Sequence, residues 1–200
     1  MHSPSTRRGA AVLRVLSINS ACARPLSIDG REVLSAIGKR GVAGAVEIGK
    51  LGLAGDEQAD PSVHGGVAKA VYLYPHEHYP FWQTVRAQAR VAGWNEALPM
   101  GACGENLTTE GLFEDQLCIG DRLVLPGCVL AVSEPRFPCF KFNAAMGFKH
   151  AAKLMVQSGF CGAYLTVIEG GAVRAGDRIE LISGPREVNI RALFRARAKA

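Results

Sequence analysis

The cysteine with the most reactive surroundings in this sequence is Cys139, which lies in the run Pro135-Arg136-Phe137-Pro138-Cys139-Phe140-Lys141. The thiolate is the form of cysteine that attacks electrophiles and binds metals, and the nearby positive charges of Arg136 and Lys141 favour it. The two prolines fix the backbone and remove two N–H donors, which is typical of a strand end or a rigid rim. A buried structural cysteine is the alternative interpretation. The charge and proline context favours a functional thiol.

Three further motifs could contact a ligand. In His64-Gly65-Gly66, the glycines permit close approach of the backbone and the His64 ring can donate to a phosphate or oxo group, although a tight turn is the alternative. Asn106, in Gly104-Glu105-Asn106-Leu107, could read a polar heterocycle with its amide or form an Asx turn. Lys39 could reach a phosphate or be an ordinary solvated lysine.

Several common chemistries are not supported by the spacing of residues. No Cys-x-x-Cys pair occurs, and His76 and His78 would point apart, so a zinc site is not predicted. There is no Gly-x-Ser-x-Gly elbow of a serine hydrolase, and neither a Walker A motif nor a dinucleotide fingerprint.

The elements that must position these side chains are mostly short strands. Apolar and β-branched runs bounded by turn residues predict strands at 12–18, 42–49, 67–74, 117–125, 128–133, 163–169 and 178–182. The turns between them include Pro126-Gly127 and Gly170-Gly171. We expect a helix that has Pro75 as its first residue, and Pro80 indicates that this helix is not long and regular. We expect a second helix over 149–158, ended by Gly159. A third begins after Asn189 as N-cap.

Composition limits the fold and the class of partner. The chain has 200 residues with 48% hydrophobic and 7% aromatic residues, which suits one mainly β domain, a barrel or sandwich. The net charge of +5 is concentrated at the ends, since residues 186–200 hold five basic residues against one acidic residue. The body is therefore close to neutral, and we expect no nucleic acid polymer as partner.

The six cysteines have irregular spacing, and no secretory signal precedes them. We therefore expect reduced thiols in a cytoplasmic protein rather than a disulfide framework. No run reaches the roughly 20 apolar residues of a membrane span, so no membrane association is expected.

Taken in order, a set of motifs resembles the MOSC domain family, which is related to the C-terminal part of molybdenum cofactor sulfurase, and within it the YiiM-like bacterial proteins. The motifs are Leu51-Gly52-Leu53-Ala54-Gly55-Asp56-Glu57-Gln58, His64-Gly65-Gly66, Ala70-Val71-Tyr72, Gly104-Glu105-Asn106-Leu107, Gly120-Asp121 and the Cys139 run. The resemblance implies a MOSC-type β-barrel with a few short peripheral helices. It divides the chain into a MOSC domain over 1–185 and the start of a truncated C-terminal helical extension over 186–200.

The resemblance also implies an activity. MOSC proteins of this type bind the molybdenum cofactor, a molybdopterin, and reduce N-hydroxylated compounds such as hydroxylaminopurine-like bases. Cys139 then becomes the molybdenum ligand and a catalytic residue, with His64 delivering protons. The expected cofactor-binding residues are Lys39, His64, Gly65, Gly66, Asn106, Arg136 and Lys141.

Two alternatives accompany that activity: a sulfur carrier or transferase using a Cys139 persulfide, and a non-catalytic cofactor binder. No iron–sulfur ligand set is visible, so the expected partners are a small-molecule substrate and a separate electron-donor protein, while the oligomeric state stays open. The sequence departs from its relatives at Cys103, where they tend to have an aromatic residue, and in the short C-terminal helix.

Overall fold

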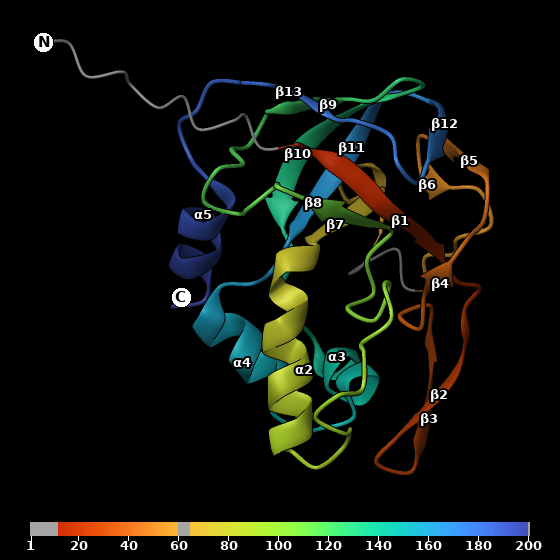
Figure 1. Ribbon diagram of the computed structural model, residues 1–200, viewed down its shortest axis with the longest axis vertical. Helices are drawn as coiled ribbons and strands as arrows, with labels where there is room; N and C mark the ends of the chain where they lie inside the picture. The colour runs from red at the N-terminus through yellow and green to blue at the C-terminus, as the bar shows by residue number, and fades with distance from the viewer. Residues whose placement is uncertain (1–11, 60–64, 200) are drawn as a thin grey trace, which may run out of the picture.

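A computed structural model describes residues 12–59 and 65–199, and its centre is an eight-stranded sheet (Figure 1). The strands of this sheet are β1 (Arg14–Ser20), β4 (Arg40–Gly41), β7 (Val71–Pro75), β8 (Leu107–Glu110), β9 (Arg122–Val124), β10 (Val129–Pro135), β11 (Ala163–Glu169) and β13 (Glu180–Ile182). Their order is β13-β9-β10-β11-β7-β8-β1-β4. Only the pair β7 and β8 is parallel.

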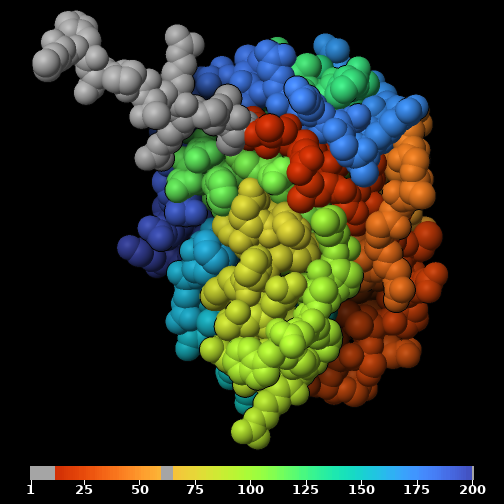
Figure 2. All heavy atoms as spheres, in the orientation of Figure 1, coloured from red at the N-terminus to blue at the C-terminus, as the bar shows by residue number. Residues whose placement is uncertain are grey.

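Two smaller sheets flank the large one. β5 (Ala45–Gly49), β6 (Gly52–Leu53) and β12 (Gly171–Arg174) form a three-stranded sheet, and β2 (Arg24–Ile28) pairs with β3 (Arg31–Ser35) in a hairpin. The hairpin projects from the body next to the segment of residues 89–105 (Figure 2). Its turn is made by Asp29 and Gly30, which both have positive φ angles, as a two-residue hairpin turn requires.

The closed barrel expected from the sequence is not found. Within the described residues, the large sheet has two free edges, β13 and β4. Residues 176–179 reach only the first part of β1, where the Val15 N–H donates to the Asp177 carbonyl (2.9 Å) and the Ile179 N–H to the Leu13 carbonyl (2.9 Å). The other end of β1 pairs with the two-residue β4. Residues 176–179 thus meet residues 13–15 through a few hydrogen bonds and one isolated bridge, Arg14 with Arg178, and β13 itself has no ladder with β1 in the described part of the chain.

The helices are few and short. They are α2 (Tyr79–Gln88), α3 (Phe140–Met146), α4 (Ala151–Ser158) and α5 (Ile190–Arg197), with 3-10 turns at Val67–Lys69 and His76–His78. α2, α3 and α4 gather at one end of the sheet, and α5 lies against its side (Figure 1). No helix in the described part of the chain is long and apolar enough to cross a bilayer.

Most elements follow the expected pattern, with several corrections. The strand expected over 117–125 covers only Arg122–Val124, the strand over 42–49 begins at Ala45, and the strand over 178–182 begins at Glu180. The strand over 163–169, the 126–127 turn between paired strands, the Gly159 helix end and the Asn189 N-cap are confirmed. The strand expected from Val67 begins only at Val71, because residues 67–69 form a 3-10 turn. Pro75 ends β7 instead of beginning a helix, and Pro80 occupies the first turn of α2, where its missing N–H costs nothing.

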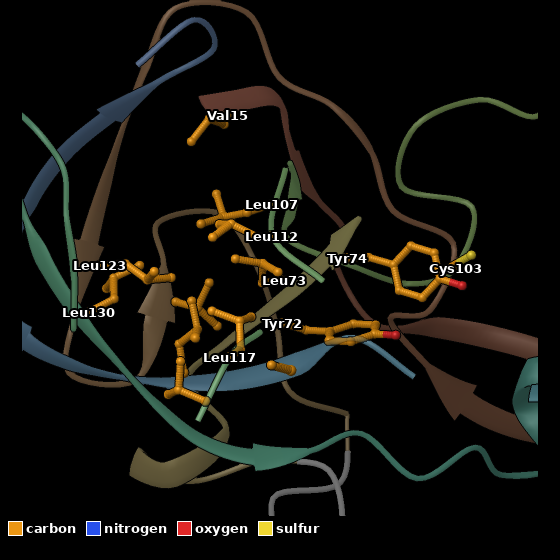
Figure 3. Close-up of a cluster of buried hydrophobic side chains, with 14 of the residues drawn as sticks. Val15, Tyr72, Leu73, Tyr74, Cys103, Leu107, Leu112, Leu117, Leu123 and Leu130 are labelled. Atoms are coloured by element: carbon orange, nitrogen blue, oxygen red, sulfur yellow. The ribbon is translucent and has the colours of Figure 1, made fainter. Parts of the chain in front are cut away.

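The core is formed by apolar side chains of the large sheet together with those of the helices, among them Trp82, Phe142 and Phe194. Figure 3 shows Leu73, Leu107 and Leu123 packed together, with the rings of Tyr72 and Tyr74 on the other side of β7. All five residues of β7 are buried, so this strand is covered on both faces. All six cysteines lie in the described residues, and none of them is joined to another by a disulfide bond there.

Candidate active site

A pocket opens where loops and strand ends far apart in sequence meet. Its lining comes from the segments 35–39, 56–59, 69–72, 104–106 and 136–141, together with Tyr164 of β11. Five of the residues expected from the sequence share this lining: Lys39, Asn106, Arg136, Cys139 and Lys141. The structure therefore brings most of the predicted site residues together in one cavity.

The His64-Gly65-Gly66 motif is placed only in part. His64 lies outside the residues that the structure describes. Gly65 and Gly66 are not among the lining residues, but the Gly66 N–H donates to Gln58 Oε1 (2.9 Å), and Gln58 does line the pocket. Gly66 has a φ of 86°, a conformation that favours glycine.

Cys139 lies between the last strand residue, Pro135, and the first residue of α3, Phe140. It is the N-cap of α3, and its carbonyl accepts from the Phe142 N–H (2.9 Å). The residue is half-buried and lines the pocket, and its backbone is held at the start of the helix. The proline-flanked segment is therefore a strand end, as the sequence predicted.

Arg136 provides a buried positive charge beside this thiol. Its side chain is enclosed by the Tyr72 ring (5.5 Å to the guanidinium carbon) and the Phe142 ring (4.7 Å), and its Nη1 contacts Met155 Sδ (3.2 Å). Within residues 12–59 and 65–199, Arg136 forms no ion pair with a carboxylate. Burial alone would lower its pKa, but the neighbouring tyrosines and Cys139 raise it. The guanidinium therefore stays charged and favours an anion nearby.

Lys39 and Asp56 form a buried ion pair on the opposite segments of the lining. The Asp56 carboxylate also accepts from the Ala21 N–H (2.9 Å) and from Asn106 Nδ2 (2.8 Å). Burial lowers the pKa of Lys39, and the attraction of Asp56 offsets this only in part. Lys39 is thus an ammonium group that gives up its proton more readily than an exposed lysine does.

Asn106 has a clear structural role. Its Oδ1 accepts from the Tyr72 N–H (3.0 Å), while its Nδ2 donates to Asp56 and to the Asn19 carbonyl (3.3 Å). Because the amide is occupied by protein atoms at both ends, Asn106 holds Asp56 against the sheet. Its expected contact with a ligand stays a prediction.

Glycines allow these segments to approach. A Cβ at Gly104 would lie 2.9 Å from Ile37 Cγ1, and one at Gly101 would lie 2.8 Å from the Lys39 carbonyl. Both glycines also have positive φ angles. They let the segment before Asn106 pack directly on the segment that carries Lys39.

The charged lining residues are predominantly basic. They are Lys39, Lys69, Arg136 and Lys141 on the positive side, and Asp56 and Glu57 on the negative side. Sequence reasoning gave no role to Asp56, Tyr72, Tyr164 or Lys69. Asp56 and Tyr72 lie within motifs that were recognised, so a buried partner for Lys39 could have been sought there. Nothing local marks Tyr164, which faces the pocket only because β11 pairs with β7.

The chain belongs to the MOSC domain family, because the model of the MOSC domain matches residues 60–180. Among its relatives is the "Uncharacterized protein YflK" of Bacillus subtilis (strain 168), 40% identical over 169 residues, which are 84% of this chain and 73% of that protein. "Protein YiiM" of Escherichia coli (strain K12) is 38% identical over 156 residues, which are 78% of this chain and 67% of that protein.

A "Reductase" of Gibberella moniliformis is 36% identical over 173 residues, but the match spans only 30% of its length. Solved structures agree with the fold. YiiM from Geobacillus stearothermophilus has a TM-score of 0.73 at 29% identity, covering 93% of this chain and 84% of that one. YiiM from Escherichia coli has a TM-score of 0.67 at 26% identity, covering 95% and 78%.

Proposed function

We propose that this protein is a molybdenum-cofactor-dependent reductase of N-hydroxylated compounds, with Cys139 as the protein ligand of the metal. The observation that carries the proposal is the position of Cys139 in a pocket whose charged residues are mainly cationic. A soft thiolate suits molybdenum alongside the sulfur atoms of a dithiolene. The substrate class comes from the family resemblance alone, whereas the relative named as a reductase supports the general type of reaction.

The pocket residues fit the chemistry of such a cofactor. The buried guanidinium of Arg136 lacks a carboxylate partner within the described residues, so the phosphate of a molybdopterin would supply the missing negative charge. Lys141 and Lys69 add two further cations to the lining. Lys39 is neutralised by Asp56, so among these cations it contributes least to anion binding.

Reduction of an N-hydroxyl group to an amine consumes two protons and two electrons and releases one water molecule. When bound, the cofactor supplies the two-electron redox chemistry. The chain supplies proton delivery: Lys39, with its lowered pKa and its contact with Asp56, can donate from the pocket wall. His64 remains a second proposed donor on sequence grounds.

The electrons are proposed to come from a separate protein. The matched region accounts for 30% of the Gibberella moniliformis reductase, so that protein carries a long additional portion outside the shared domain. The shared domain is therefore one part of a protein named as a reductase, which is consistent with a MOSC domain that works together with a further component.

Substitution of the ligand tests the proposal directly. Protein produced in a host that synthesises the cofactor should contain a stoichiometric amount of molybdenum by elemental analysis. Cys139→Ser should lose molybdenum by at least about tenfold, because even outer-shell substitutions cost 10–100-fold. It should also lose reduction of N-hydroxylated bases. Cys22→Ser, which alters an exposed cysteine outside the lining, is the matched control and should keep both.

Two results would favour the alternatives. Cyanide-releasable sulfur on Cys139 in protein that takes up no molybdenum would indicate a sulfur carrier or transferase. Stoichiometric molybdenum without reductase activity, tested with a chemical electron donor, would indicate a cofactor binder. Full activity of Cys139→Ser would overturn the ligand assignment itself.

A further inference from the structure

We infer that α5 positions the cysteine segment, through a stacking contact between Phe194 and Phe137; the significance of this for catalysis rests on the proposed role of Cys139. Phe194 lies on α5 and is fully buried. Phe137 lies two residues before Cys139 and is half-buried. Their ring centroids are 4.8 Å apart, with planes inclined by 28°.

The cysteine segment needs such support because it has little regular backbone structure. β10 ends at Pro135, α3 begins at Phe140, and Pro138 has no N–H to donate. Side chains therefore fix the path of the chain. Arg136 is held from one side by Tyr72, Phe142 and Met155, all described above. Phe137 is held from the other side by Phe194.

α5 can act as a fixed point because its first turn is anchored to the body independently of the cysteine segment. The Ile190 N–H donates to the Leu117 carbonyl (2.9 Å), and the Arg191 N–H donates to the Glu114 carbonyl (3.0 Å). Arg191 Nη1 also pairs with Asp115 Oδ2 (3.2 Å).

Ile190 and Phe194 share one face of the helix at a spacing of four residues, and both are fully buried. Ile190 lies in the first turn of α5, which is bonded to the 114–117 segment, whereas Phe194 stacks on Phe137 of the cysteine segment. A second contact with the same region joins Arg197 Nη1 and Glu134 Oε2 (3.8 Å), next to the end of β10. The helix thus links the 114–117 segment to the residues that precede Cys139.

The difference between Ile190 and Phe194 gives the test its control. In a Cys22→Ser background, the metal-free full-length protein is treated with iodoacetamide, and alkylation of Cys139 is followed by mass spectrometry. Phe194→Ala should be alkylated several-fold faster at Cys139 because its segment opens more often. Ile190→Ala should lower the urea midpoint comparably but leave this rate close to that of the parent.

Milder variants keep the test decisive if the alanine variants fold poorly. Phe194→Leu and Phe137→Leu should each accelerate alkylation, and the double variant should react no faster than the faster single variant, because both remove the same contact. Phe194→Tyr, which keeps the ring, should restore the parent rate. Equal acceleration by Ile190→Ala and Phe194→Ala, or no acceleration by either leucine variant, would overturn the inference.

The outcome is independent of the proposed function because the alkylation uses protein without cofactor. If Cys139→Ser retains its molybdenum, the ligand assignment fails while the alkylation result still decides whether α5 positions the segment. If the assignment holds, Phe194→Leu made in a cofactor-producing host should retain less molybdenum than Ile190→Val.

Discussion

Glu105 is a carboxyl group enclosed in the protein interior next to the pocket residue Asn106. Its Oε1 accepts from the Gly101 N–H (2.9 Å), from Thr108 Oγ1 (2.7 Å) and from the Tyr79 hydroxyl. Its Oε2 is buried and has no hydrogen-bond partner within the described residues. Burial raises the pKa of Glu105, and these donors reduce the effect without cancelling it.

This environment predicts a pH-dependent stability. Because the folded state holds the proton to higher pH than the unfolded state, the contribution of Glu105 is complete below its unfolded pKa near 4.5 and is lost as pH rises through the folded pKa. Glu105→Gln should therefore gain stability relative to the parent as pH rises, by at most about 1.4 kcal/mol per pH unit. Urea unfolding at a series of pH values measures this.

The exposed Glu47→Gln on β5 is the control for this measurement and should show the same pH dependence as the parent. Parallel curves for Glu105→Gln and the parent would show that the interior carboxyl is ionised equally in both states.

At the scale of single residues, the sequence predicted which residues line the pocket better than it predicted their hydrogen-bond and ion-pair partners. Cys139, Arg136 and Lys141 could be found because charge and proline pattern lie within one short run. The pairing of Lys39 with Asp56 could not, since the two are 17 residues apart and meet through the fold. Asn106 was recognised, but its amide binds the protein through strand neighbours that only the sheet order reveals.

At the scale of elements, the small sheet meets the large one where the first residues of β12 contact the turn between β9 and β10. A Cβ at Gly127, in the turn between β9 and β10, would lie 2.2 Å from the Ala172 carbonyl, and one at Gly171 would lie 2.1 Å from the Gly127 carbonyl. The two backbones are therefore in direct contact, and neither has room for a side chain.

Gly127→Ala should lower the free energy of unfolding by about 1–3 kcal/mol, because the new methyl group meets backbone atoms that can move only with their strands. Gly49→Ala is the control, since a Cβ there meets nothing within 4 Å, and we expect it to change stability by less than about 0.5 kcal/mol. Urea unfolding of both variants measures the difference. Equal free energies of unfolding for the two variants would show that the turn can move away from β12 without loss of stability.

The elements that sequence reasoning missed or misplaced differ in whether the sequence carries a local signal for them. The hairpin of β2 and β3 carries a local signal, Asp29-Gly30 between two polar and β-branched runs, which is typical of a two-residue turn. The strand expected from Val67 was placed too early because the mostly apolar run of residues 67–71, which contains Lys69, is compatible with a strand and with a 3-10 turn. Tertiary contacts decide that choice.

At the scale of the whole molecule, α5 belongs to the same apolar cluster as the sheet, since Ile190 and Phe194 are both fully buried within it. The division of the chain at residue 185 stays a prediction, and it can be tested by truncation. Removing residues 186–200 should lower the free energy of unfolding by about 3–6 kcal/mol, from about 1.5–3 kcal/mol for each buried side chain.

A truncation that removes only residues 198–200 is the control and should unfold at the parent urea concentration, because it leaves both buried side chains in place. If the longer truncation also unfolds at the parent concentration, residues 186–200 are a separable extension.

The mainly β composition of the molecule was predictable from short apolar runs and frequent turns, whereas the closure of the sheet was not. Closure depends on whether the two sides of the sheet share a continuous ladder, and here residues 176–179 form only a few hydrogen bonds with residues 13–15. Neither the extent of this contact nor its partner is encoded in hydrophobic periodicity.

The parallel pairing of β7 with β8 has a consequence for the order of events during folding. Between Pro75 and Leu107 the chain must form α2 and return across the sheet before Asn106 can meet Tyr72. Long-range parallel pairing of this kind is slow, because the loop must be closed before the contacts form. We therefore expect the pocket to be among the last parts of the molecule to assemble. Under the proposed function, a cofactor would bind only the finished fold and stabilise it by mass action, so its binding would report that folding is complete.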